Sequence, residues 1–282
     1  MYVVDLNQVM ISNIIMSMSK IGGEVDENLI RHFVLNSLRS YNVKFRDEYG
    51  EMIIACDDTN NWRKQFFPYY KANRKRDREA SSLNWNAIFS ALNNVREEIK
   101  NFFPYRVIQI STAEADDVIG VLCTEFGNTP EKILIVSGDK DYRQLQSFMN
   151  VHQYDPVQKK WINENNPELY LKTHILKGDV SDGIPNFLSA DDTFVMKIRQ
   201  KPISQKMLDE WVKQDPSKFC DSTMLSRYNR NQMMIDMSKI PENIKTAVME
   251  SYHAQANKSR EHLFNYFIQH RLKNLMSDLN QF

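Results

Sequence analysis

The stretch Ser111-Thr-Ala-Glu-Ala-Asp-Asp117 leads into an apolar segment, and Ile133-Leu-Ile-Val-Ser-Gly-Asp-Lys-Asp141 ends a second one. After the first, apolar residues recur at helical spacing, which predicts a helix whose first turn carries Glu114 and two aspartates. Ser111 and Glu114 also fit a capping box, which would give Glu114 a purely structural role.

The second stretch is a continuous apolar run between Lys132 and Ser137, typical of a parallel strand that is buried on both faces. Asp139 and Asp141 follow its C-terminal end. Ligands bind at that edge of an open α/β sheet. Both stretches therefore bring carboxylates to a place where a site is expected.

Three more apolar runs, at 2–4, 52–56 and 105–110, also predict buried strands, and the first two end in Asp5 and Asp57. Their alternation with helical segments predicts an α/β fold with a mostly parallel central sheet flanked by helices. We expect an edge hairpin near 151–162 to close the sheet. The α/β domain would span residues 1–176 with a basic arch at about 58–82, and a helical region would span 177–282.

Parallel strands would bring these acids together at one edge of the sheet. A single aspartate at a strand end is usually just solvated, but four consecutive elements share the pattern. Two charges about 4 Å apart repel by roughly 4 kcal/mol at an effective dielectric constant of about 20, so the cluster needs cations. An all-oxygen donor set suits Mg²⁺, or Mn²⁺ as a substitute, and two such ions would assist phosphodiester hydrolysis.

Basic and aromatic residues alternate from Trp62 to Arg78, directly after Asp57. Cations neutralise phosphates and rings stack on unpaired bases, so this segment favours single-stranded or frayed nucleic acid. An ordinary solvated helix with a partly buried aromatic stripe is the alternative.

Composition sets further bounds. The chain has 36 basic and 36 acidic residues, so nucleic-acid binding must come from segregated charge. Cys56, Cys123 and Cys220 lack a paired spacing, which argues against disulfides and structural zinc and for a reducing compartment. The six histidines lack metal-ligand spacing and are expected on the surface or in packing. We expect no membrane span and no signal peptide.

Four motifs together resemble the flap endonuclease and 5′ nuclease family: Tyr-Lys-Ala-Asn-Arg at 70–74, Glu-Ala-Asp-Asp at 114–117, Ser-Gly-Asp-Lys-Asp at 137–141 and Gly-Asp-Val-Ser-Asp-Gly-Ile-Pro at 178–185. Segments at 228–230, 235–244 and 280–282 are most similar to the phage T4-type ribonuclease H group. The resemblance implies a 5′-to-3′ exonuclease with flap endonuclease activity that removes RNA primers from lagging-strand fragments.

The resemblance also implies residue roles. The first metal would be held by Asp5, Asp57, Glu114 and Asp116, and the second would lie among Asp139, Asp141, Asp179 and Asp182. Asp117 would contact these ligands without binding a metal ion itself. Lys71 and Arg74 would steer the scissile phosphate. Nucleic-acid contacts are implied for Arg63, Lys64, Tyr70, Lys71, Arg74, Lys75 and Arg76 in the arch and for Gly178, Ser181 and Gly183 in a helix-turn-helix module.

Expected partners are RNA/DNA hybrids, flapped or nicked duplex DNA and, through the C-terminal region, a single-stranded DNA-binding protein, all in the cytoplasm of an infected bacterial cell. Two departures narrow this picture. The glycine-rich second half of the helix-turn-helix module is replaced by residues 186–192, so we expect no monovalent cation there. The chain starts at its first strand, so we do not expect a sliding clamp to bind through that end.

Two other function classes share some of these features. A haloacid-type phosphatase also combines an α/β sheet with carboxylates, but it needs a second aspartate two residues after Asp5, where this chain has Asn7. A non-catalytic nucleic-acid-binding protein would keep the basic arch. It would have no reason to keep the clustered acids.

Overall fold

A computed structural model gives the structure of the chain and describes residues 1–21, 26–81 and 83–282. The side chains of residues 13, 15–21, 75–77 and 79 lie outside this description, and so do the contacts predicted for Lys75 and Arg76. Among the described helices, none is long and apolar enough to cross a membrane.

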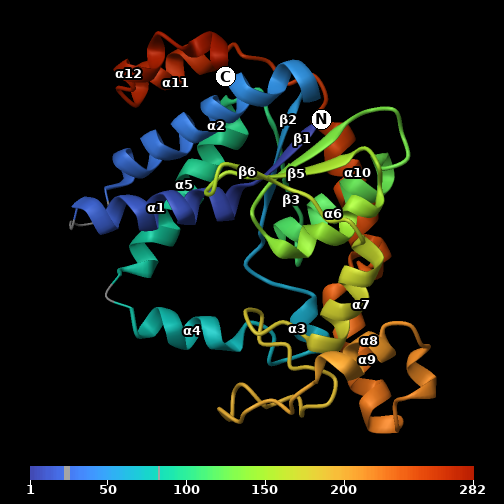
Figure 1. Cartoon of the computed structure of the whole chain (residues 1–282). Coiled ribbons are helices and arrows are strands. Elements are labelled where there is room, and N and C mark those ends of the chain that lie inside the picture. Colours follow the sequence, from blue (N-terminus) through green and yellow to red (C-terminus); the bar gives the residue numbers. More distant parts are fainter. Residues whose placement is uncertain (22–25, 82) are drawn as a thin grey trace.

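A six-stranded sheet forms the centre of the molecule (Figure 1). Its strands are β1 (Tyr2–Asp5), β2 (Met52–Cys56), β3 (Arg106–Gln109), β4 (Ile133–Val136), β5 (Val151–Asp155) and β6 (Lys160–Ile162). They lie in the order β3-β2-β1-β4-β5-β6, and every pair is parallel except β5 with β6. The predicted mostly parallel sheet and its edge hairpin are confirmed.

Helices cover both faces of the sheet. The described helices are α1 (Leu6–Ile21), α2 (Glu27–Tyr49), α3 (Arg63–Phe66), α4 (Ala72–Glu79), α5 (Trp85–Phe102), α6 (Ala115–Phe126), α7 (Pro167–Lys177), α8 (Gln205–Trp211), α9 (Ser222–Ile235), α10 (Glu242–Ala254), α11 (Leu263–Gln269) and α12 (Lys273–Met276). Of these, α1, α2 and α5 pack on one face of the sheet, and α6 and α10 pack on the other. Short 3-10 helices are η1 (Lys140–Ser147), η2 (Pro216–Lys218), η3 (Met237–Lys239) and η4 (Leu279–Gln281).

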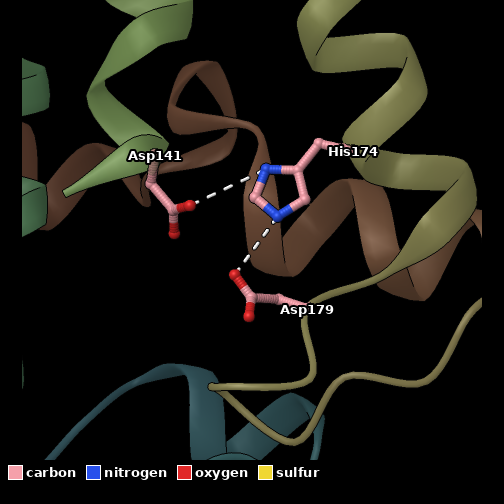
Figure 2. A group of neighbouring side chains, drawn as sticks. All are labelled: Asp141, His174 and Asp179. Atoms are coloured by element: carbon pink, nitrogen blue, oxygen red, sulfur yellow. Dashed lines mark hydrogen bonds and ion pairs between the residues drawn. The ribbon is translucent and has the colours of Figure 1, made fainter. Parts of the chain in front are cut away.

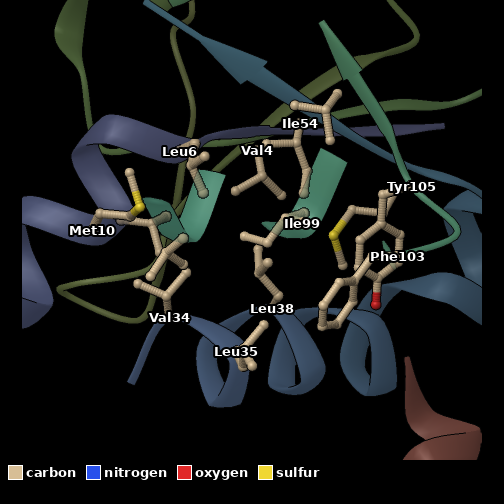
Figure 3. Packing of buried hydrophobic residues seen from close by; sticks show 14 of the residues in the cluster. Val4, Leu6, Met10, Val34, Leu35, Leu38, Ile54, Ile99, Phe103 and Tyr105 are labelled. Atoms are coloured by element: carbon tan, nitrogen blue, oxygen red, sulfur yellow. The ribbon is translucent and has the colours of Figure 1, made fainter. Parts of the chain in front are cut away.

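The continuous apolar character of the strands follows from this two-sided cover. Val4 and Ile54 point toward α1, α2 and α5, where they pack with residues such as Leu38 and Ile99 (Figure 3). Val3 and Ile53 point the other way, into a second core that includes α6 and α10. Successive residues of a strand face opposite sides, so a strand buried on both faces has no room for polar residues except at its ends.

The helix that carries the Glu-Ala-Asp-Asp motif starts later than the capping box at Ser111 predicts. Its N-cap is Glu114, and the side chain of Asp117 accepts a hydrogen bond of 2.9 Å from the Glu114 backbone N–H, so these two residues form the box. Thr112 has a φ of 65°, and its N–H donates to Asp58, which holds residues 111–113 in a turn. The predicted cap at Ser111 is wrong because this turn precedes the helix.

The helices of the C-terminal region pack in three different cores, of which the smallest joins α8 to Leu176 and Phe187. Helix α10 packs on the second core, whereas α11, α12 and the terminal Phe282 pack on the first.

The helix-turn-helix prediction needs correction, because residues 187–204 form turns and extended chain after α7. The Asn186 side chain accepts from Leu188 N and Ser189 Oγ and donates to Lys201 O, so local side-chain bonds compete with a second helix.

Candidate active site

The strand order brings the predicted acids to one edge. Strand β1 lies between β2 and β4. The chain first adds β2 and β3 on one side of β1 and then adds β4 and β5 on the other side, and a ligand site is expected beside such a switch point. Asp5 ends β1, Asp57 follows β2 and Asp139 follows β4. Helix α6 adds Glu114 and Asp116 from its N-terminal end.

The acids are close enough to perturb one another. Burial, followed by the charges of Asp57 and Asp139, raises the pKa of Asp5 to about 7. Burial and Asp139 likewise raise the pKa of Asp116 well above its usual range and that of Asp141 to about 7. Asp139 therefore neighbours three other carboxylates, and their ionised forms need added positive charge.

Hydrogen bonds from the chain fix these carboxylates in place. The Ala115 N–H donates to Asp57 Oδ1 at 2.8 Å, and the Asn7 amide donates to Oδ2 of the same residue. The Tyr142 hydroxyl donates to Asp116 Oδ1 at 2.5 Å and to Asp5 Oδ2 at 3.3 Å. Sequence reasoning missed Asn7 and Tyr142. Their closeness to aspartates in the sequence was the only signal.

The arch meets the acids through two cations. Lys71 Nζ lies 2.6 Å from Glu114 Oε1 and 3.5 Å from Asp182 Oδ2, and Arg74 Nη2 lies 2.6 Å from Asp182 Oδ1. Burial alone would raise the pKa of Glu114, but Lys71 and Arg63 lower it to about 2. The Lys71 N–H also donates to the Asp182 carbonyl at 2.8 Å, which joins the arch to the 178–183 turn.

Two residues predicted to touch nucleic acid are instead buried. Arg63 is 4% exposed, and its guanidinium lies 2.8 Å from Asp117 Oδ1. Tyr70 is 2% exposed, and its hydroxyl donates to Glu114 Oε2 and Asp182 Oδ2. Neither side chain can reach a nucleic acid in this structure, because both complete the interior beneath the arch. Lys64 is exposed, as the prediction requires.

A second group of ligand atoms lies beside the first (Figure 2). Asp141, His174 and Asp179 each offer one such atom, and these atoms lie within 4.8 Å of one another. Asp182, predicted to join this group, instead accepts from Tyr70 and the arch cations. The last turn of α7 places His174, one of the histidines expected on the surface or in packing, in a buried position between two carboxylates.

The 178–183 turn requires glycine at two positions. Gly178 has a φ of 67°, and a Cβ there would lie 2.3 Å from the Ile184 carbonyl oxygen. Gly183 has a φ of 72° and lies under the arch backbone, where a Cβ would lie 3.1 Å from the Tyr69 carbonyl oxygen. Ser181 is exposed, and its hydroxyl donates to Asp179. The turn therefore presents Asp179 and Asp182 while it supports the arch.

Comparison with known proteins identifies the family of the chain. Residues 15–173 match the 5′-3′ exonuclease N-terminal resolvase-like domain, and residues 165–282 match the C-terminal domain of T4 RNase H. The ribonuclease H of Enterobacteria phage T4 is 32% identical over 270 residues, which cover 92% of this chain and 88% of that protein. The chain belongs to the 5′-3′ exonuclease family of T4 ribonuclease H. The resemblance inferred from its motifs is confirmed.

Two further proteins match over less of the chain or at lower identity. Flap endonuclease Xni of Shewanella oneidensis is 32% identical to this exonuclease-family chain over 111 residues, 39% of each protein. A flap endonuclease of bacteriophage T5, solved with DNA and metal ions, superposes with a TM-score of 0.64 at 14% identity, over 90% of this chain and 98% of its own. That likeness supports the fold.

Proposed function

We propose that this 5′-3′ exonuclease hydrolyses phosphodiester bonds in RNA/DNA hybrids and in flapped or nicked duplex DNA, with two Mg²⁺ ions that Mn²⁺ can replace. Its proposed role is the removal of RNA primers during lagging-strand replication. The names of the phage T4 and Shewanella relatives, a ribonuclease H and a flap endonuclease, support these substrates.

The observation that carries the proposal is the position of Asp139 among Asp5, Asp116 and Asp141, whose pKa values burial and its charge raise. Carboxylates are oxygen donors of the type that Mg²⁺ prefers. The eight predicted acids and Asp117 have four nearby cations, Lys71, Arg74, Lys140 and Arg63, so the fully ionised group has an excess of five negative charges. Two divalent ions would offset most of that excess.

Carboxylate oxygens are donors of the kind that two divalent ions would need. The first would be held by Asp5, Asp57, Glu114 and Asp116, and the second by Asp139 and Asp141 with Asp179 and Asp182 beside them. Asp141 Oδ1 is buried and has no hydrogen-bond partner among the described residues, so it is free to bind a cation. When bound, the two ions supply positive charge to the attacking and leaving oxygens of an in-line displacement.

The chain itself positions the substrate. Lys71 and Arg74 reach the acidic edge from the arch and can take a phosphate in place of a carboxylate. Phe66 and Tyr69 expose part of their rings on the same arch, where unpaired bases could stack. This arrangement suits a frayed 5′ end lying between the arch and the carboxyl ends of the strands.

The test is cleavage of a 5′-labelled flapped or nicked duplex with Mg²⁺, compared with EDTA. Asp57→Asn and Asp116→Asn should each abolish cleavage and keep the fold, because each removes one of several repelling charges. Asp58→Asn is the matched control. The Asp58 carboxylate accepts from Thr112 N, an interaction that an amide oxygen can also make. Undiminished Mg²⁺-dependent cleavage by both site variants would refute the proposed metal site.

A further inference from the structure

His174 has an unusual environment for a buried histidine. Its side chain is 8% exposed and lies between two carboxylates, with Nε2 at 3.2 Å from Asp179 Oδ2 and Nδ1 at 3.7 Å from Asp141 Oδ1 (Figure 2). The Tyr170 ring packs against the imidazole edge to face, with centroids 5.8 Å apart. The ring is therefore fixed in orientation, with one nitrogen aimed at each acid.

Asp179 is already fully engaged by the chain. Its Oδ1 accepts from Ser181 N at 2.9 Å, from the Ser181 hydroxyl and from Asp182 N at 3.3 Å. Its Oδ2 accepts from His174 Nε2 and lies 2.8 Å from Lys140 Nζ. A carboxylate has about four lone-pair directions, so little capacity remains for a metal ion. Asp179 is better placed to orient the imidazole than to bind an ion.

The opposite nitrogen has no such partner. His174 Nδ1 and Asp141 Oδ1 are both buried without a hydrogen bond among the described residues, and their separation of 3.7 Å is too long for one. Asp179 is an acceptor, so a neutral imidazole would carry its proton on Nε2 and a lone pair on Nδ1. Two buried acceptors that face each other are unfavourable unless a proton or a metal ion lies between them.

We propose that His174 Nδ1 is a ligand of the second metal ion together with Asp141, and that Asp179 orients the imidazole. This inference deepens the proposed function, on which it rests for the existence of a second ion. Adjacent donors about 2.1 Å from an octahedral ion lie about 3 Å apart, so the two atoms need to approach by less than 1 Å. A carboxylate–histidine–metal arrangement of this kind raises the basicity of the coordinating nitrogen.

The donor type has a consequence for metal preference. Carboxylate oxygens suit both Mg²⁺ and Mn²⁺, whereas an imidazole nitrogen is a poorer donor for Mg²⁺ than for a first-row transition-metal ion. An ion held by Asp141 and His174 should therefore bind Mn²⁺ over Mg²⁺ more strongly than an all-oxygen site does. The preference belongs to the second ion, since no histidine lies among the predicted ligands of the first.

The direct test is pulsed electron paramagnetic resonance of Mn²⁺ bound to the full chain without nucleic acid. Coordination by His174 predicts modulation from a directly bound ¹⁴N nucleus in the wild-type spectrum, a measurement that requires no variant to fold. His174→Gln should remove the modulation, weaken Mn²⁺ binding about 10- to 100-fold and change Mg²⁺ binding much less.

His152→Gln is the matched control. His152 also has an Nδ1 without a hydrogen bond, but it pairs with Leu134 in the first half of β4, away from the acidic edge, and packs on Tyr49. This variant should keep the modulation and the Mn²⁺ affinity of the wild type. Loss of both in His152→Gln would place the nitrogen ligand elsewhere and overturn the inference.

Two further results would also overturn it. Bound Mn²⁺ without ¹⁴N modulation would leave an all-oxygen site. The second is a ¹⁵N NMR spectrum that shows both nitrogens of His174 protonated at saturating Mg²⁺. The imidazolium itself would then be the cation between the two acids, and Nδ1 would have no lone pair for a metal ion. Cleavage of the flapped duplex reports separately on the proposed function, because a cleaving enzyme without nitrogen coupling refutes only the role of His174. A protein that binds Mn²⁺ through nitrogen but cleaves nothing refutes only the nuclease proposal.

Discussion

Removal of the Arg63 guanidinium should destabilise the protein without a direct effect on nucleic-acid binding. Arg63 Nη1 donates to Asp117 Oδ2 at 3.1 Å and to Glu114 Oε2 at 3.2 Å, and Nε donates to the Met234 carbonyl at 3.1 Å. Asp117 is fully buried, so Arg63→Met leaves an uncompensated charge in the interior. The methionine keeps most of the apolar stem, which isolates the loss of charge.

The structure sets the size of the effect. Loss of one partner of a buried ion pair costs about 3 to 5 kcal/mol. Asp117 would keep hydrogen bonds from Trp62 Nε1 at 3.0 Å and Glu114 N at 2.9 Å, which favours the lower half of that range. With a urea m-value of about 3 kcal/mol per molar, the unfolding midpoint should fall by roughly 1 M. Arg63→Met with Asp117→Asn should lose less than the sum of the two single variants.

The assays are urea unfolding and the salt dependence of binding to a flapped duplex below the unfolding transition. Lys64→Ala is the control, because Lys64 is the exposed neighbour on the same helix. It should change stability by less than about 0.5 kcal/mol and, if it contacts a phosphate, lower the salt slope by about one. The opposite pattern, an Arg63→Met variant of wild-type stability with a reduced salt slope, would show that Arg63 faces nucleic acid and would refute the argument.

Three other predictions follow from single contacts. Gly178 and Gly50 both have a positive φ, but only at Gly178 would a Cβ clash with its neighbours. Calorimetry should therefore show that Gly178→Ala destabilises the protein by about 1 kcal/mol or more beyond the effect of Gly50→Ala. Burial would raise the pKa of Glu98, but a 2.7 Å hydrogen bond from Arg31 and its other partners lower that pKa. The stability that the ionised Glu98 contributes is therefore fully present above pH 4.5 and should be lost as the pH falls through the lowered pKa. Glu98→Gln should flatten that acid limb; an unchanged limb would contradict this role. Lys71→Ala should lower the single-turnover plateau even at saturating enzyme, and recovery of the wild-type plateau would leave the arch a tethering role only.

The fold was predictable because its signals are local. A strand buried on both faces has to be apolar along its whole length, and a parallel sheet brings all its C-terminal strand ends to one edge. These two facts place Asp5, Asp57 and Asp139 together without any knowledge of side-chain packing. The strand order was not predictable. An apolar run indicates a buried strand, but its sequence does not indicate on which side of the sheet that strand is added.

Burial of polar residues was not predictable in the same way. Arg63 and Tyr70 stand in a segment of alternating cations and aromatic residues, where exposure is the natural expectation. Their burial depends on Asp117 and Asp182, which lie 54 and 112 residues further along the chain. A sequence pattern reports the character of a segment, whereas a buried ion pair depends on which distant segment packs on it.

His174 is an instance of the same limit at the proposed metal site. A histidine near the end of a helix is an ordinary feature, and nothing within α7 distinguishes it from a surface residue. Its surroundings are set by the packing of α7 against η1, which places Nδ1 opposite Asp141, and by the Gly178 turn, which brings Asp179 back to Nε2. The acids that a parallel sheet collects can be found from sequence alone. The buried imidazole beside them follows only from the way in which a helix outside the sheet packs against that edge.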